Sequence, residues 1–280
     1  MTRLIGVLSA LGALQVLTAP CLADTVDPRK DLEEFQAYFK RSFPEIPFDE
    51  YSNGLYALPA AAARRAEWEQ IEEFPPYELE VEMGRNYWEE NNLGKCFKNG
   101  GVGIAQNYPY WDKERKMFRT AELDINDCLV RNGKTPIKDL KKGTMAQVVA
   151  YFRYMSRGNR LSPQIDLSDP AALAEYEYGR RYFWAKRGQL NFACADCHIQ
   201  SAGKYIGGNI LSTALGHGAG FPAYRSKWGG LGTIHRRYGG CNSQVRAAPL
   251  DPQSREYRAL EFYEAYMNTG LPLTAPSQRF

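Results

Sequence analysis

The run Cys194-Ala195-Asp196-Cys197-His198 constrains this chain more than any other feature of its sequence. Two thiols three residues apart on one helical turn reach the two vinyl groups of a haem, and the adjacent imidazole then lies beneath the iron as its proximal ligand. This spacing is typical of covalent c-type haem attachment and predicts one haem c, held by Cys194 and Cys197 with His198 on the metal. The alternative is a redox Cys-x-x-Cys or a disulfide beside an incidental histidine. Such motifs belong to a strand-helix context that the sequence lacks.

The first 23 residues have the pattern of a secretory signal peptide. Arg3 precedes an apolar run over residues 4–17, and small residues follow as far as Ala23, after which we expect cleavage. The apolar run is too short for a membrane anchor, and no later stretch reaches spanning length. The alternatives are a buried N-terminal helix and a lipidated Cys21, although Pro20 disfavours lipidation there. The sequence therefore predicts an exported protein without a membrane anchor.

The charge balance limits the class of partner. The 280 residues hold 35 Lys and Arg against 32 Asp and Glu, a formal net charge of +3, and 44% of them are hydrophobic. Such a balance provides no electrostatic basis for bulk nucleic-acid binding, so any basic chemistry must be local. The length suits one large domain or two ordinary ones.

Two parts of the chain resemble each other in order and content. Residues 82–88 and 177–183 both read Glu-x-Gly-Arg-x-Tyr-aromatic, and residues 154–158 and 266–270 both read Tyr-Met-x-x-Gly. Each half carries a cysteine 12 or 15 residues after the glycine of its Glu-x-Gly-Arg motif and another cysteine further on. We interpret this pattern as an internal duplication.

The expected fold class is all-α, because strand alternation is scarce and helical periodicity is clear in several places. The duplication divides the chain into two tandem cytochrome c-like domains. The first, over residues 24–160, is degenerate and includes a helical extension, and the second, over residues 161–280, binds haem. Start and stop signals such as Asp169-Pro170 and Gly158 place the helices. They are expected from near Asp31 to before Pro44, and over residues 60–74, 144–156, 170–185 and 255–268.

The first half has lost the attachment pattern and should hold no haem. Only Cys96 remains of it, and no histidine precedes His198. Cys96 and Cys128 stand where an attachment thiol and a distal ligand would be, so we expect them to lie close together and form a disulfide. Two free thiols are the alternative. Aromatic side chains are expected to fill the space of the missing haem, because an unfilled core is costly. They are Tyr108, Tyr110, Trp111 and Phe118.

Cys241 stands where the second domain should carry its distal haem ligand, 43 residues after His198 and shortly before the closing helix. Such a ligand normally arrives from the loop ahead of that helix. His217 is the rival for this position, whereas Met267 belongs to the duplicated Tyr-Met-x-x-Gly element and is assigned to core packing. A buried, inert thiol is the remaining alternative for Cys241. His235 is expected to face solvent or a partner.

The surroundings of Cys241 favour a reactive thiolate. Arg236, Arg237 and Arg246 lie within five residues of it, and cations both stabilise an ionised thiol and bind oxyanions. The pair Gly239-Gly240 would let an anion or a partner backbone approach closely. A solvated surface run of arginines is the alternative. A sulfur ligand would also lower the haem potential, which indicates sulfur chemistry rather than generic electron transfer.

The attachment motif, the run Arg237-Tyr238-Gly239-Gly240-Cys241 and the duplicated halves resemble the SoxA family, c-type cytochromes of the periplasmic Sox thiosulfate-oxidising system, over nearly the full mature length. The resemblance is to the one-haem type, in which a disulfide replaces the N-terminal haem. It implies L-cysteine S-thiosulfotransfer, in which thiosulfate is joined oxidatively to a cysteine thiol of the carrier SoxYZ and electrons pass to haem. It also implies a heterodimer with the small cytochrome SoxX. Cys241, as thiolate or persulfide, is then distal iron ligand and catalytic cysteine, and Arg237 contacts the substrate anion.

Two other functions stay open on the sequence alone. A periplasmic electron-transfer cytochrome c without transferase activity would exchange electrons with small partners and show no dependence on Arg237. A haem-bearing scaffold for a catalytic partner would hold Cys241 out of reach of alkylating reagents.

Overall fold

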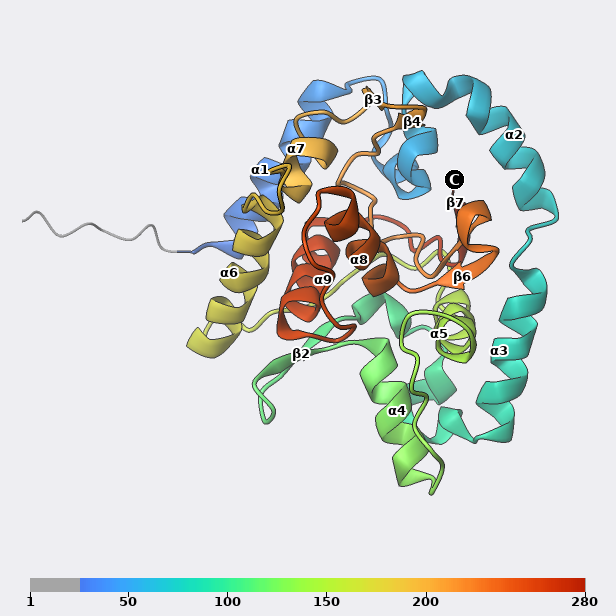
Figure 1. Ribbon diagram of the computed structural model, residues 1–280. Helices are drawn as coiled ribbons and strands as arrows, with labels where there is room; N and C mark the ends of the chain where they lie inside the picture. The colour runs from blue at the N-terminus through green and yellow to red at the C-terminus, as the bar shows by residue number, and fades with distance from the viewer. Residues whose placement is uncertain (1–25, 280) are drawn as a thin grey trace, which may run out of the picture.

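The structure, a computed structural model, describes residues 26–279 and is built mainly of helices (Figure 1). The expected signal peptide, residues 1–23, lies outside the described residues. Within residues 26–279 no helix is both long and apolar enough to cross a membrane. The α-helices are α1 (Pro28–Ser42), α2 (Ala62–Glu73), α3 (Glu78–Glu90), α4 (Ala121–Arg131), α5 (Thr144–Tyr154), α6 (Pro170–Trp184), α7 (Cys194–His198), α8 (Ile234–Gln244) and α9 (Arg255–Met267).

The structure also contains short β-strands, so the expectation of an all-α fold is wrong in part. The pairs β1–β2 and β3–β4 are antiparallel, and β5 pairs antiparallel with β6 and parallel with β7. Each strand has two or three residues, too few for a period-two pattern to be visible in the sequence. The strands are β1 (Tyr110–Asp112), β2 (Met117–Arg119), β3 (Tyr205–Ile206), β4 (Asn209–Ile210), β5 (Ala223–Arg225), β6 (Gly230–Gly232) and β7 (Ser277–Arg279).

Two of the three Asp-Pro pairs in the sequence start a helix, and the third, Asp251-Pro252, does not. At α6 the carboxylate of Asp169 accepts a hydrogen bond from Ala171 N at 2.9 Å, with proline at the first helical position, which confirms the expected start. Helix α1 begins earlier than expected, because the carboxylate of Asp27 accepts from Arg29 N and Lys30 N just ahead of Pro28. The other expected helices correspond to α2, α5 and α9.

Each half contains one tightly packed helix pair, α3 with α5 and α6 with α9, as Figure 1 shows. The first crossing occurs at Gly84, where an added Cβ would overlap the carbonyl of Gln147. The second occurs at Gly179, where an added Cβ would overlap the carbonyl of Ala259. These are the glycines of the repeated Glu-x-Gly-Arg motif, so the same motif makes the same kind of close backbone approach in both halves.

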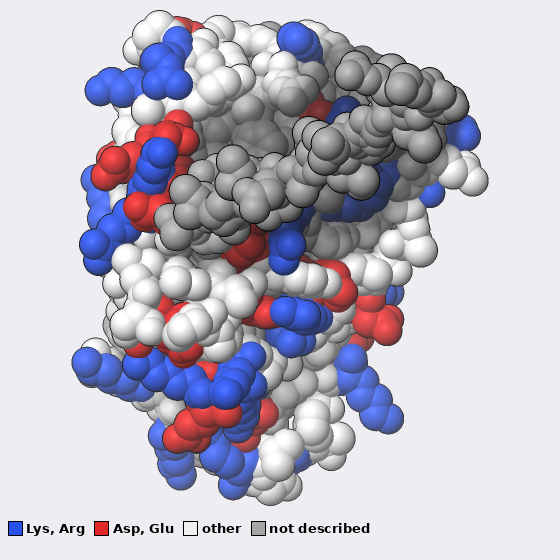
Figure 2. All heavy atoms as spheres, turned by 90° about the vertical axis from the view of Figure 1, so that its left-hand side faces the viewer, with Lys and Arg blue, Asp and Glu red and all other residues white. Residues whose placement is uncertain are grey.

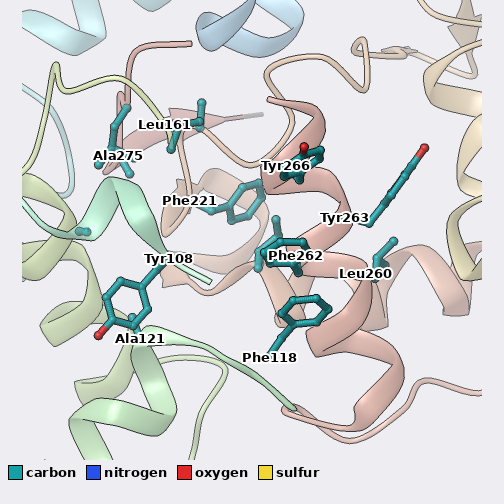
Figure 3. Packing of buried hydrophobic residues seen from close by; sticks show 14 of the residues in the cluster. Tyr108, Phe118, Ala121, Leu161, Phe221, Leu260, Phe262, Tyr263, Tyr266 and Ala275 are labelled. Carbon is teal, nitrogen blue, oxygen red and sulfur yellow. The ribbon is translucent and has the colours of Figure 1, made fainter. Parts of the chain in front are cut away.

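The two halves share a continuous hydrophobic core (Figure 3). Phe118 of β2 stacks on Phe262 of α9 with ring centroids 3.7 Å apart. Trp111 packs edge-on against Phe118, and its Nε1 donates to Asp169 Oδ2 at 2.8 Å. Trp111 and Phe118 therefore bridge the two halves. The expectation that they fill a vacated haem space inside the first half is wrong.

Charges on the face shown in Figure 2 are mixed in sign wherever described atoms are visible. This face is the left-hand side of Figure 1, where α6 lies. On α6, Arg180 pairs with Glu177 at 2.6 Å, and Glu175 pairs with Arg255 of α9 at 2.8 Å. Surface charge is thus locally neutralised here, in contrast to the cavity described next.

Candidate functional site

Helix α7 is a single turn that carries both thiols of the attachment motif. The carboxylate of Asp196 accepts a hydrogen bond from Ala193 N at 2.8 Å and closes the start of this turn. Cys194 and Cys197 are both free and half-buried. Burial, with a smaller effect of Glu264, raises the pKa of Cys194 to about 12, and burial also raises the pKa of Cys197. Both groups are therefore neutral thiols in this environment.

His198 ends α7 with its ring held in one tautomer. Its Nδ1 lies 2.9 Å from the carbonyl oxygen of Ser212, which can only accept, so Nδ1 carries the proton and donates. The other nitrogen, Nε2, is left with its lone pair. Burial, followed by the neighbouring His217, lowers the pKa of His198 well below its usual value. A neutral imidazole whose second nitrogen is fixed by a carbonyl is the usual form of a metal-binding histidine.

Arg237 and Cys241 lie on α8, and not in a loop as expected for the distal ligand. The spacing of four residues puts their side chains on one face of the helix. The adjoining face is buried and includes His235, Tyr238 and Asn242. Both functional side chains are half-buried at the edge of a cavity, which Tyr238 and Asn242 also line.

His235 is buried at 1% exposure, so its expected position facing solvent or a partner is wrong. Its Nδ1 accepts from Gln253 N at 3.0 Å, and its Nε2 lies 3.0 Å from Glu261 Oε2 of α9. The sequence did contain a signal for this burial. His235, Tyr238 and Asn242 are spaced three and four residues apart, which places them on one helical face.

A cavity of about 300 Å³ brings together the four residues expected to hold haem, Cys194, Cys197, His198 and Cys241. Its volume lies at the lower end of the range of ligand pockets in proteins. Its walls carry apolar side chains, from Leu190, Phe192, Ile206, Leu211, Val245 and Leu260. Two free thiols on one turn, a neutral imidazole and a further sulfur at one largely apolar cavity fit the chemistry of a covalently attached haem. The residues present therefore fit haem c.

His217 lines the same cavity but does not lie across it from His198. The two imidazole rings pack against each other with centroids 4.3 Å apart. Axial imidazoles on opposite faces of one iron have bonding nitrogens about 4 Å apart, because each metal–nitrogen bond is about 2 Å, and the ring centroids lie farther apart still. The geometry disfavours His217 as the distal ligand. Met267 is fully buried in the core, where the sequence placed it.

A second cavity of about 520 Å³ adjoins the first and shares His198, His217 and Arg237 with it. Among residues 26–279, its lining includes four cationic side chains besides Arg237 and no Asp or Glu. Burial, followed by the nearby Arg237, lowers the pKa of Arg225 to about 10. The four cations come from α2, β5, the turn after it and β7, and are Arg64, Arg225, Lys227 and Arg279. We call this space the basic cavity.

Of the three arginines that lie near Cys241 in the sequence, only Arg237 lines the two cavities. Arg236 turns away, with its guanidinium 4.4 Å from the ring of Trp228, and exposed Arg246 lines neither cavity. Arg225 and Arg279 are 54 residues apart along the chain, and only the β5–β7 pairing, with Arg225 opposite Arg279, brings them together. No local pattern could have revealed them.

In the first half, Cys96 and Cys128 form a disulfide, with their Cα atoms 5.8 Å apart. Phe97, the next residue after Cys96, packs on Trp88 and Phe152 with ring centroids 5.1 and 5.2 Å away. Tyr108, one of the four aromatics expected here, also packs on Phe152. The space near the disulfide is thus filled mainly by rings that the sequence did not single out.

Comparisons with known proteins agree with one another. A family model described as SoxA/TsdA, cytochrome c domain, matches residues 84–161. The L-cysteine S-thiosulfotransferase subunit SoxA of Allochromatium vinosum is 46% identical over 257 residues, covering 90% of each chain. That of Chlorobaculum tepidum is 43% identical, covering 89% of this chain and 87% of the relative. The crystal structure of SoxXA from P. pantotrophus is similar with a TM-score of 0.69 and 26% identity, covering 77% of this chain and 84% of that one.

Proposed function

The chain belongs to the SoxA family, and from that premise we propose that it is the L-cysteine S-thiosulfotransferase subunit of a thiosulfate-oxidising system. One observation carries the proposal. Arg237 and Cys241 project from the same face of α8 at the junction of an apolar cavity that fits haem and a basic cavity that fits an anion. A plain electron carrier needs the first cavity and cations for the haem propionates, but it has no use for a free thiol one helical turn from an anion-binding arginine.

The cofactor we propose is a single haem c. Cys194 and Cys197 would carry its thioether bonds, His198 Nε2 would be the proximal ligand and Cys241 Sγ the distal ligand. The carbonyl of Ser212 keeps His198 in the required tautomer. The closure of α7 by Asp196 keeps both thiols on one turn.

The basic cavity is proposed to admit thiosulfate. A dianion entering it meets Arg225, Lys227 and Arg279 with no carboxylate among the lining residues, so its charge is offset along the way. Arg237 lines both cavities and is the proposed contact for the sulfonate, since a guanidinium offers two parallel donors to such a group. This contact leaves the outer sulfur of thiosulfate directed toward Cys241, one helical turn further along α8.

The proposed reaction is covalent transfer through Cys241, as thiolate or persulfide. Its sulfur forms a transient bond to the outer sulfur of thiosulfate, and the adduct passes to a cysteine thiol of the carrier SoxYZ. In the net change the carrier thiol loses its proton, a sulfur–sulfur bond to thiosulfate forms, and two electrons leave. When bound, haem c can accept one of these electrons, and the other is left for a SoxX-type cytochrome partner. Because the substrates and partners belong to the periplasm, we propose that location for this chain.

We further propose that the two halves are diverged copies of one cytochrome c domain, residues 24–160 and 161–280. The matched cytochrome c model covers residues 84–161, a stretch with no Cys-x-x-Cys-His motif. Both halves make the same glycine-mediated helix crossing, at Gly84 and Gly179. The first copy would have lost its haem and gained the Cys96–Cys128 disulfide.

The test uses the holoprotein with thiosulfate and carrier. Cys241→Met should keep haem attached, as judged by intact mass, and abolish carrier-dependent turnover. Arg237→Gln should raise the KM for thiosulfate about tenfold to a hundredfold, the effect of losing a charged hydrogen-bonded contact. Arg246→Gln is the matched control, because this exposed arginine lines neither cavity. Full turnover in Cys241→Met, or equal KM values in the two arginine variants, would show that the chain is an electron carrier.

A further inference from the structure

Glu264 of α9 is a buried carboxylate, 3% exposed, whose two oxygens contact different parts of the site. Oε2 accepts a hydrogen bond from the hydroxyl of Tyr238 at 2.5 Å. Oε1 lies 3.1 Å from Nδ1 of His217. Neither the haem-binding residues nor the anion contact of the proposed function includes this group, yet it lines the same cavity.

The Tyr238 bond ties Glu264 to the helix that carries Cys241. Tyr238 precedes Cys241 by three residues, about one helical turn, and is buried at the edge of the same cavity. Apolar packing alone restricts the rotation of a short helix weakly, whereas a hydrogen bond to a carboxylate has a required direction. A rotation of α8 by one residue is about 100°, enough to turn Cys241 out of the cavity.

The His217 contact ties the same carboxylate to the region around His198. The ring of His217 packs on that of His198, and the carbonyl of His198 accepts from Ala214 N at 2.8 Å. Asn268, four residues after Glu264, accepts from Gly216 N at 2.5 Å through its Oδ1. The segment 214–217 that supports His198 is therefore held to α9 at two points.

We propose that Glu264 is a positioning residue that sets the spacing between His198 and Cys241 by holding the supports of both to α9. The inference rests on the proposed function, because Cys241 is the distal ligand there. An apolar side chain would fill the same space without the desolvation penalty of a buried carboxylate. A carboxylate differs from an apolar side chain in making two directed contacts, one to Tyr238 beside Cys241 and one to His217 beside His198.

The experiment is a competition between Cys241 and added imidazole for the iron of the ferric holoprotein, followed in the Soret band. In Tyr238→Phe and in Glu264→Gln, the imidazole concentration that displaces half of the sulfur ligand should fall about tenfold. Tyr238→Phe removes the hydrogen bond that orients α8, and Glu264→Gln replaces its charged acceptor by a neutral amide with one acceptor oxygen for the two contacts. Tyr176→Phe is the matched control. It removes a buried tyrosine–carboxylate bond of 2.9 Å, to Asp31, that does not involve α8. Thermal unfolding is measured for all three variants.

The proposal is overturned if Tyr238→Phe and Glu264→Gln lower the melting temperature as Tyr176→Phe does while the imidazole competition stays at the wild-type value. If Glu264→Gln assembles no holoprotein, Tyr238→Phe decides alone, because it retains the ring and removes only the hydroxyl. Failure of the proposed function has a different signature. In that case the wild-type ferric spectrum itself shows no sulfur ligand, and Cys241→Met leaves it unchanged.

Discussion

Removal of the Cys96–Cys128 disulfide should lower the free energy of unfolding by about 4 kcal/mol. The two cysteines are 32 residues apart in sequence. For a closed loop of this length the chain-entropy relation predicts a loss of between 3 and 4 kcal/mol, because the unfolded chain regains the conformations that the cross-link excluded. Cys128 is fully buried, so its replacement by alanine adds a smaller term for lost packing.

The measurement is guanidinium unfolding of the holoprotein, wild type against Cys96→Ala/Cys128→Ala, followed by far-ultraviolet circular dichroism. The midpoint should fall in proportion to the loss, and thermal unfolding should shift down by roughly 10 °C. Haem content should not change, because the residues that fit haem lie in α7 and α8, in the other half. Wild type reduced before unfolding is the control, and it should lose the same free energy without any substitution.

Two results would refute this reasoning. A loss below about 1 kcal/mol in both the variant and the reduced wild type would mean that the first half keeps its structure without the cross-link. In that case the packing of Phe97 on Trp88 and Phe152 would be sufficient to hold it together. A loss of haem from the variant would mean that the first half is needed to form the haem cavity, and not only to stabilise the chain.

Two further predictions concern packing and buried charge. Gly179→Ala should lower the free energy of unfolding by about 1–3 kcal/mol in chemical unfolding, because a Cβ there overlaps the carbonyl of Ala259 and α6 must move away from α9. The control is Gly208→Ala, which should be nearly neutral because no atom lies near an added Cβ there. Burial, followed by repulsion from Glu261, raises the pKa of Glu122 from 4.5 to about 7. Between pH 4.5 and 7 the native state therefore binds more protons than the unfolded state. The free energy of unfolding should fall as the pH rises through this range, by up to about 3 kcal/mol. Glu122→Gln should flatten that fall between pH 5 and 8 in guanidinium titrations, and an unchanged slope would contradict the assignment.

Features encoded over a few neighbouring residues were predictable from the sequence. The spacing of Cys194, Cys197 and His198 indicated a single helical turn, which is α7. The Asp169-Pro170 pair specified the start of α6, because a cap needs only its own carboxylate and the next backbone amides. The repeated Glu-x-Gly-Arg motif marked both close helix crossings in the same way, since only glycine allows such an approach.

Features that depend on long-range pairing were not predictable. The basic cavity forms only when β7 pairs with β5 and places Arg279 beside Arg225, and neither strand is long enough to be recognised. His235 looked exposed beside Arg236 and Arg237. Its burial depends on contact with α9, where Glu261 and the amide of Gln253 provide its polar partners. A buried polar group of this kind resembles a surface residue until its partner is known.

The first half also positions the helix that carries Arg237 and Cys241. Helix α8 starts where Thr233 bonds to the first half, with its amide donating to Lys141 O at 2.9 Å and its hydroxyl to Leu140 O at 3.0 Å. From that point α8 runs to the cavity and delivers Arg237 and Cys241. The placement of Arg237 and Cys241 therefore depends on the first half of the chain as well as on the second.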